Sequence, residues 1–581
     1  MRKIAVSLVS LVTICASAET VYTYEDDGKT VVATVPGGET NELSTAVVGA
    51  LNDNTYTNFV KRGDGMLLVL DTDAPNTYLG EIHIEEGYYV SRLTQAANPK
   101  ANYTVGAFEG GAVYVKDGAS WRIWASSGVC DSYVNTKKVY FEGRGPNDDA
   151  ALCIHTASNN QFGKTFGGEM IMTGDALVWN NIHGFGGIPG SAAKLNMQGY
   201  TLTFRNRLAG AGSGVYCYCG NGSDATYISQ LGDIVAEEGG VNISGSMYWL
   251  ACAVDAHTFT VTNNANFTIN GCWGYNQYKL RLYPGATIYC NGNAYGDSNN
   301  PYGCVYSQYG NKLIGSVELL DPVRNSYCAN SGNYINENGA MSGGGISVDN
   351  GMRLFISNPN NSFTNGVVVN GTSRLIVTGA KAVPSAGAPL VLNDTAYVHF
   401  PSTLQYELPE VICAGLTNTL YGTMGYTYPL DTGDIPNGCQ YYTNLTLKGG
   451  VVNATTNVLV TALKGFGEFV GDIQELQLRD GSWEFKVSDA LDGKSLKVKR
   501  FRAMGDVIDT EFIINLDRVQ RGAVSCKIVQ TTDFISDVGS KSKITLGGEQ
   551  ADHGTWTITK GSDNLSWVLS YIPPGTTIIV K

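Results

Sequence analysis

Few residues in this sequence are grouped in a way that suggests catalysis. Two pairs of adjacent aspartates occur, Asp26-Asp27 and Asp148-Asp149. Clustered carboxylates can share general acid and general base work, as sugar-cleaving sites require. Adjacent residues of a strand point to opposite faces, however, and both pairs lie in turn-like stretches. We therefore interpret both pairs as solvated turns.

Other catalytic signals are equally sparse. The six histidines are isolated in the sequence. His183, in NIHGFGG, is the leading candidate for a functional histidine, but we interpret it as a polar loop residue. The sequence contains no nucleophile elbow, HExxH motif, P-loop, EF-hand loop or run of calcium-binding nonapeptides. It predicts no catalytic, cofactor-binding or metal-binding residue and no cofactor, although a site assembled from distant segments leaves no motif.

The tripeptide Arg62-Gly63-Asp64 is known from adhesive ligands. Short motifs of this kind have a high false-positive rate. Gly63 and Gly65 are also the glycines expected where a chain turns a corner, because they can adopt φ values forbidden to other residues. We favour the structural interpretation, in which Arg62 and Asp64 are solvated between turn glycines.

Tyrosines offer the best lead to a binding surface. Exposed rings present a flat apolar face with a polar edge and can stack on sugars. Rings at equivalent positions of a repeat can instead pack on one another as a ladder, which is the interpretation we favour. The relevant tyrosines, all in one Gly/Asn-rich stretch, are Tyr275, Tyr278, Tyr283, Tyr289, Tyr295, Tyr302, Tyr306 and Tyr309.

The N-terminal segment predicts export. Arg2 and Lys3 precede an apolar run, and Ala16-Ser17-Ala18 fits a small-x-small cleavage site, so residues 1–18 form the expected signal peptide. No other stretch approaches the ~20 apolar residues of a membrane helix. The net charge of −13 disfavours nucleic acid as a partner. We expect a secreted or cell-surface protein, with outer-membrane association left open.

Cysteines are concentrated in one part of the chain. Nine of the 13 lie between Cys130 and Cys328, and an exported chain could oxidise them. No spacing typical of a zinc site occurs. Cysteine can equally serve as a small apolar residue at repeated core positions. The sequence leaves both the redox state and any disulfide connectivity open.

Short alternating strands separated by Gly and Asn-rich turns dominate the sequence. This texture predicts an all-β solenoid, barrel or sandwich. A loose repeat favours the solenoid, because Gly65-Met66 recurs as Gly351-Met352, and Tyr78 recurs as Phe363 after a polar turn. The strand near residue 67 could bury either Leu67 and Val69 or Leu68 and Leu70, since alternate residues share a face.

The first copy resembles the autotransporter-associated β-strand repeat, K-x-G-x-G-x-L-x-L followed by N-x-Y-x-G. Val69 replaces the second Leu, and the second copy has Ser347 and Asp349 at the Lys and first Gly positions. Residues 167–204 also resemble exported bacterial proteins of this class. The residues that carry the main match are Lys61, Gly63, Gly65, Leu67, Asn76, Tyr78 and Gly80.

The resemblance implies a right-handed parallel β-helix, as in passenger regions displayed outside the cell. The chain ends in LSYIPPGTTIIVK, without a recognisable run of membrane-barrel strands, so we expect a passenger without its own translocator. The expected segments are a signal peptide (1–18), an N-terminal β region with the first repeat (19–110), a β-solenoid (111–400), a Tyr/Thr/Gly-rich excursion or linker (401–460) and a C-terminal β region or cap (461–581).

Three functional hypotheses remain. The first is a secreted or surface β-solenoid with a structural, display or adhesive role and no catalysis, a largely fold-level inference. The second is a polysaccharide-active β-helix enzyme, either a lyase or a glycosidase. The third is a surface protein that binds carbohydrate through the Tyr-rich segment. Glycans or other surface components are the expected partners, and the oligomeric state is left open.

Overall fold

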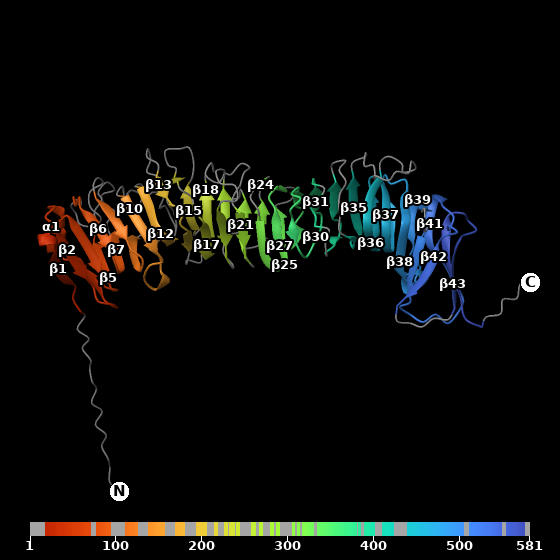
Figure 1. The fold of residues 1–581 in the computed structure, drawn as a ribbon, viewed down its shortest axis with the longest axis horizontal. Helices are drawn as coiled ribbons and strands as arrows, with labels where there is room; N and C mark the ends of the chain where they lie inside the picture. The colour runs from red at the N-terminus through yellow and green to blue at the C-terminus, as the bar shows by residue number, and fades with distance from the viewer. Residues whose placement is uncertain are drawn as a thin grey trace, which may run out of the picture. The chain divides into compact units, whose positions relative to one another are not determined.

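The computed structural model divides the chain into two compact units, Met1–Ile243 and Ser244–Lys581. The described residues are mostly β, and their sheet is long and largely parallel, as expected (Figure 1). The structure describes residues 18–70, 77–93, 111–125, 138–156, 169–180, 193–205, 214–218, 226–229, 232–238, 240–244, 257–262, 266–270, 279–283, 286–290, 305–307, 311–313, 317–329, 334–379, 381–384, 388–400, 410–422, 439–504, 510–548 and 554–575.

Unit 1 begins with one antiparallel pair, β1 (Val21–Glu25) with β2 (Thr30–Thr34), and then continues in parallel. Each strand pairs with the strand two places later in the chain. The first parallel series consists of β2, β4 (Asn58–Arg62), β6 (Glu81–Ile84), β8 (Ala112–Val115) and β10 (Lys138–Gly143). The second consists of β5 (Met66–Leu70), β7 (Gly87–Leu93), β9 (Ala119–Ala125), β11 (Leu152–Thr156) and β12 (Glu169–Asn180).

Alternate residues of these strands form a continuous buried column. In the second series, Leu67 lies opposite Tyr89, which lies opposite Trp121, and each is at most 3% exposed. Leu67 and Val69 therefore supply the inward face that the sequence left undecided, and Leu68 faces the other side. Because each strand is too short to bury its own apolar face, stacking supplies the core.

The glycines of the first repeat are required where the chain turns. Gly63 has a φ of 75°, and a Cβ added there would lie 2.3 Å from the Val35 carbonyl oxygen. At Gly65 an added Cβ would lie 2.1 Å from the Pro36 carbonyl oxygen. The expected turn conformation is confirmed at Gly63, whereas Gly65 is required by close backbone approach.

The two aromatic residues of the repeat fill corresponding places. Tyr78 and Phe363 are each 2% exposed. Beside Phe363, the buried Asn361 accepts a hydrogen bond from the Met341 N–H (2.9 Å) and donates one to the Ala382 carbonyl (2.7 Å). Asn361 thus links three successive segments of chain.

Unit 2 repeats this pattern with strands 19 to 23 residues apart. Ile335, Leu354, Leu375, Val398 and Leu420 lie opposite one another in order, and each is at most 1% exposed. The strands that carry this column are β26 (Tyr334–Glu337), β28 (Arg353–Ile356), β31 (Arg374–Val377), β33 (Tyr397–Phe400) and β35 (Thr417–Gly422). Parallel pairing continues into β36 (Cys439–Ala454) and β37 (Asn457–Val470).

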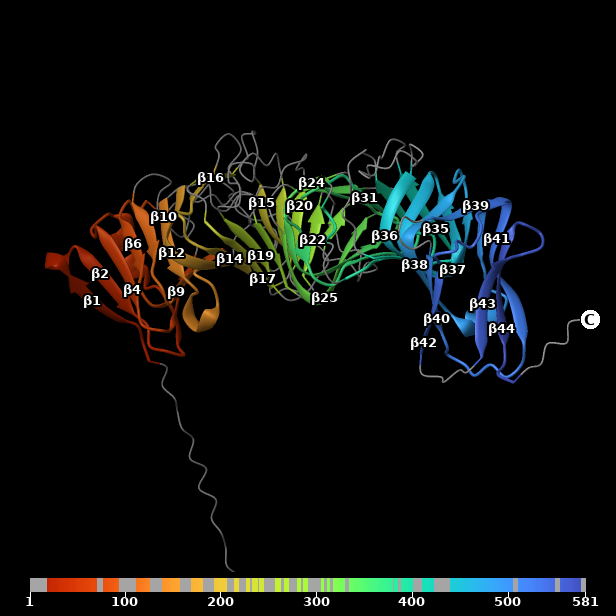
Figure 2. The same ribbon diagram turned by 45° about the vertical axis from the view of Figure 1, so that its right-hand side comes forward.

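The C-terminal strands of unit 2 change from parallel to antiparallel pairing. β41 pairs antiparallel with β44, and β44 pairs antiparallel with β43 (Figure 2). Large rings fill this end, with Trp483, Phe501 and Trp567 each fully buried. The strands are β38 (Leu476–Lys486), β39 (Leu496–Met504), β40 (Thr510–Asn515), β41 (Val524–Ile535), β42 (Lys543–Gly547), β43 (Thr555–Lys560) and β44 (Ser566–Ile572). The described α-helices are short, α1 (Thr45–Asn52) and α2 (Val487–Leu491).

Candidate functional site

Arg62 of the Arg-Gly-Asp tripeptide is held by carboxylates of neighbouring segments. Its Nη1 lies 2.8 Å from Glu25 Oε1, and its Nε lies 2.6 Å from Glu85 Oε2. Asp64 is exposed at the turn. An adhesive tripeptide needs its arginine available to a receptor, so these ion pairs favour the structural interpretation of Arg62-Gly63-Asp64.

The preceding residue, Lys61, is buried and stabilises the turn that contains Gly63. Its Nζ donates hydrogen bonds to three carbonyl oxygens, those of Arg62 (3.0 Å), Gly63 (2.5 Å) and Glu86 (2.9 Å). Burial lowers the pKa of Lys61 to about 8, so the ammonium form still predominates at neutral pH. The lysine of the repeat pattern therefore has a structural explanation: it satisfies backbone oxygens that turn inward.

The Asp148-Asp149 pair lies in a turn between β10 and β11 with an unusual backbone. Asn147, Asp148 and Ala150 have φ values of 52°, 60° and 89°. Non-glycine residues in this region cost ~1–3 kcal/mol each and persist only where the surroundings fix them. The turn is therefore held by its neighbours.

Arg205, distant in the chain, and Arg144, four residues before Asp148, provide that constraint. The Arg205 side chain is 6% exposed, and its Nη2 lies 2.7 Å from Asp148 Oδ2 and 3.0 Å from Glu237 Oε1. Arg144 also pairs with Asp148, and its Nη2 lies 2.8 Å from Glu237 Oε2. The arginine–carboxylate cluster contains Arg122, Arg144, Asp148, Asp149, Arg205 and Glu237.

The electrostatics of this cluster favour a structural role, a clamp that holds the turn in place, over a catalytic role. Hydrogen bonds from Arg144 and then Arg205 lower the pKa of Asp148 to about 2. A general acid must hold a proton near the working pH, which requires a raised pKa. Asp148 lies in a turn, as expected, but it is an ionised partner in a network of ion pairs rather than a simply solvated group.

An aromatic ladder runs along the outer face of β6, β8 and β10 in unit 1. The rings of His83 and Tyr114 lie 4.6 Å apart at an angle of 6°, and those of Tyr114 and Tyr140 lie 4.8 Å apart at 7°. Glu81 contacts His83 Nε2 (3.1 Å) and accepts a hydrogen bond from the Tyr114 hydroxyl (3.3 Å). Because inner rings cover one another, this ladder offers solvent mainly ring edges, which are poor surfaces for stacking a sugar.

The outer face of β26, β28, β31, β33 and β35 in unit 2 has a different character. Its residues alternate with the buried column Ile335 to Leu420, so they point to the opposite side. We call this surface the aromatic–arginine face. Its ten residues are Tyr334, Asn336, Arg353, Phe355, Arg374, Ile376, Tyr397, His399, Thr419 and Tyr421.

Rings and guanidinium groups contact one another across this face. The Arg374 guanidinium carbon lies 5.1 Å from the centre of the Tyr397 ring, and that of Arg353 lies 5.7 Å from the Tyr334 ring. The Tyr397 and Tyr421 rings lie 5.8 Å apart at 27°. Such cation–π contacts hold the guanidinium groups against the rings, and a guanidinium held in this way can still donate through its outer N–H groups, as Arg374 could.

Charge is distributed unevenly on the aromatic–arginine face. None of its ten residues is Asp or Glu, although the whole chain carries a net charge of −13. Burial lowers the pKa of His399, so His399 is neutral at neutral pH and the positive charge comes from Arg353 and Arg374. In unit 1, by contrast, Lys138 pairs with Glu169 across strands at 3.1 Å.

Several residues singled out from the sequence lie outside the described part of the chain. These include His183 and Asn76. Of the clustered tyrosines, only Tyr283 has a described side chain, and it is half-buried. The backbone places Tyr289 opposite Tyr306 on adjacent parallel strands, the equivalent positions that the ladder interpretation requires.

Among the described cysteines, Cys413 occupies a core position. It lies opposite Leu392 on one side and Leu447 on the other, and all three are at most 3% exposed. Burial raises the pKa of the Cys413 thiol to about 12, which makes it a poor nucleophile. Of the nine cysteines between 130 and 328, only Cys153 has a described side chain, and it too is buried.

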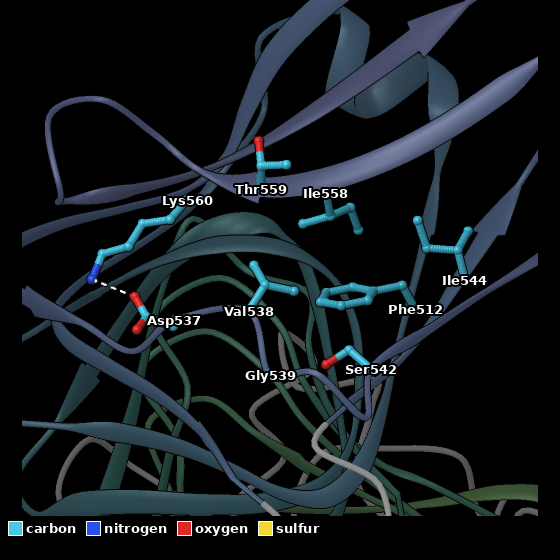
Figure 3. Close-up of a pocket in the computed structure, with 9 residues that line it drawn as sticks. All are labelled: Phe512, Asp537, Val538, Gly539, Ser542, Ile544, Ile558, Thr559 and Lys560. Atoms are coloured by element: carbon cyan, nitrogen blue, oxygen red, sulfur yellow. Dashed lines mark hydrogen bonds and ion pairs between the residues drawn. The ribbon is translucent and has the colours of Figure 1, made fainter.

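A shallow hollow of about 490 Å³ lies near the C-terminal strands (Figure 3). Its only charged lining residues are Asp537 and Lys560, which pair at 2.9 Å. The Asp537 side chain is 86% exposed, so this pair lies in solvent. The lining residues are Phe512, Asp537, Val538, Gly539, Ser542, Ile544, Ile558, Thr559 and Lys560.

Neither a cluster of metal ligands nor a long apolar helix occurs among the described residues. Within the described ranges, no three His, Cys, Asp or Glu side chains come together as metal ligands. In the portion of the chain that the structure describes, no helix has the length and apolar character needed to cross a membrane.

Comparison of the chain with known proteins gives no match. No protein-family model, no curated protein and no solved structure matches the sequence or the fold. The aromatic–arginine face is therefore the candidate functional site on the strength of its own geometry: exposed rings, fixed guanidinium groups and an absence of carboxylates among its ten residues.

Proposed function

We propose that this protein is a secreted or cell-surface right-handed parallel β-solenoid with a structural, display or adhesive role and no catalytic activity. The observation that carries the proposal is the buried column of unit 2, in which equivalent residues recur every 19 to 23 positions. Each interval of 19 to 23 residues adds one strand to the stack, as in a scaffold built from repeats. The resemblance of residues 61–80 to the autotransporter-associated repeat supports a passenger-like role.

The chemistry of the described clusters favours a role without catalysis. Asp148 is kept ionised by two arginines, and Cys413 is buried with a raised pKa. Neither group has the properties that general acid or nucleophilic catalysis requires. None of the described clusters favours the alternative of a polysaccharide lyase or glycosidase.

Adhesion is favoured over a purely structural role by the aromatic–arginine face. Exposed tyrosines and arginine are typical of binding surfaces, because they supply large contact areas with directed polar groups. Tyr334 and Tyr421 are each 37% exposed, at opposite ends of this face. The carbohydrate-binding hypothesis is therefore retained, with these tyrosines in place of the 275–309 cluster.

Two measurements test the proposed function. On intact cells of the organism that makes the protein, externally added protease should digest the full chain. Purified protein, incubated with a panel of neutral and acidic polysaccharides, should release neither unsaturated uronic acids nor new reducing ends. Protection from protease on intact cells would contradict surface exposure, and turnover of any polysaccharide would replace the scaffold with an enzyme.

A further inference from the structure

We propose that the aromatic–arginine face binds an acidic polysaccharide, a glycan chain that carries carboxylate or sulfate groups. This inference rests on the proposed adhesive function and adds the class of ligand. It depends on three features of the ten residues defined above: their charge, the spacing of the two arginines and the placement of the exposed rings.

The charge of the face is complementary to an anion. Arg353 and Arg374 lie directly opposite each other on the adjacent parallel strands β28 and β31. Like charges in this arrangement repel, and adjacent strands are only ~4.8 Å apart. Among the described residues, Arg374 has no carboxylate within ion-pair distance. An anion bound between the two guanidinium groups would relieve the repulsion and accept hydrogen bonds from both.

The rings define the chemistry and size of the ligand. Tyr334 and Tyr421 are separated by the four strand steps from β26 to β35, about 19 Å at ~4.8 Å per strand. A small anion could occupy only the arginine pair between them. An extended chain of sugar rings can reach both ends, with its apolar ring faces on the tyrosines and its acidic groups at the arginines.

A polysaccharide fits better than a nucleic acid. Single-stranded nucleic acids also combine stacking with negative charge, but they bind along grooves with many cationic contacts. Here two arginines supply the charge on a chain whose net charge is −13, so a densely charged phosphate backbone would be repelled by the rest of the protein. A glycan with one acidic group per sugar, or fewer, has the lower charge density that this face can match.

The test measures binding of the purified full chain to immobilised polygalacturonate and kappa-carrageenan, which carry no more than one acidic group per sugar, with neutral dextran as a blank. Wild-type protein should bind at least one of the two acidic glycans, and added salt should weaken the binding. The two acidic probes distinguish carboxylated from sulfated ligands. Arg374→Gln should weaken binding about tenfold or more, because it removes a charged donor.

Matched variants separate the site from general charge effects. Lys138→Gln removes the same charge from a unit 1 strand, where the lysine is paired with Glu169, and should leave binding unchanged. Arg374→Lys should recover part of the affinity, since charge is retained and the planar fork is lost. Tyr421→Ser should weaken binding without changing its salt dependence.

Three results would overturn the inference. They are no binding to either acidic glycan by folded wild-type protein, equal binding by Arg374→Gln, or tighter binding to a single-stranded oligothymidine than to both glycans. A protein that is digested on intact cells yet binds neither glycan would refute the ligand class alone. Protection from protease would instead refute the proposed function.

Discussion

Glu337 provides a sharp test of the inward and outward assignment in unit 2. It is fully buried, and it lies in the column of strand residues between Leu313 and Ile356. The Tyr327 hydroxyl donates a hydrogen bond to Glu337 Oε2 at 3.5 Å. Burial raises the pKa of Glu337 well above 4.5, and the hydrogen bonds from Tyr327 and the Gly339 backbone offset this only in part.

The raised pKa has a definite effect on stability. Below pH 4.5 the carboxyl is protonated in both folded and unfolded chains, and its contribution is fully present. Above pH 4.5 the unfolded chain releases the proton while the folded chain retains it, so the free energy of unfolding falls by ~1.4 kcal/mol per pH unit until the folded pKa is reached. At pH 5.5 the loss is already ~1.4 kcal/mol.

Glu337→Gln removes this titration while keeping the size of the side chain. Because the other groups titrate alike in both proteins, we expect the free energy of unfolding of the wild type, minus that of the variant, to fall by more than ~1 kcal/mol between pH 5 and 6 in urea unfolding. The difference in slope is the readout, because the amide changes the absolute stability for other reasons. Glu468→Gln, at a position 45% exposed on β37, is the control and should keep the wild-type slope. Identical slopes for Glu337→Gln and wild type would show that Glu337 is not buried.

Three further substitutions test unit 1. Arg205→Ala should lower the free energy of unfolding by ~1–3 kcal/mol, because the partly exposed Asp148 and Glu237 lose a charged hydrogen-bond donor; a loss below ~0.5 kcal/mol in urea unfolding would contradict the clamp. Gly63→Ala should cost more than ~2 kcal/mol, since its Cβ would meet backbone, whereas Asp64→Ala should cost less than ~0.5 kcal/mol. Equal losses at Gly63 and Asp64 would undermine the structural account of the tripeptide.

Local signals in the sequence predicted the parts of the fold that depend on local rules. Gly63 was expected at a turn because glycine tolerates positive φ, and its φ is 75°. The recurrence of Tyr78 as Phe363 places a large ring at the same position of both copies, and both rings are buried. The sequence could not choose between the two faces of the strand at Leu67, because four consecutive apolar residues satisfy both alternatives.

The aromatic–arginine face could not be predicted from the sequence, because its members are far apart in the chain. Tyr334, Arg353, Arg374 and Tyr397 become neighbours only through strand register. The tyrosines between 275 and 309 were binding candidates only because they are close together in the sequence. Glu337 was missed in the same way: in Tyr334-Ile-Asn-Glu337 nothing local indicates that the final carboxyl points inward.

Parallel stacking of the unit 2 strands is most directly tested by distances along one row of outward residues. The strand register places four outward residues in one row, with Val470 at one end. Counted in strands from Val470, Tyr334 is six strands away, Arg353 five and Arg374 four. Spin labels on non-canonical residues at these positions would leave native cysteines unmodified. Pulsed electron resonance should give separations from Val470 of about 29, 24 and 19 Å, at ~4.8 Å per strand. Separations that fail to decrease by about 5 Å from one site to the next would contradict the stacked-strand account.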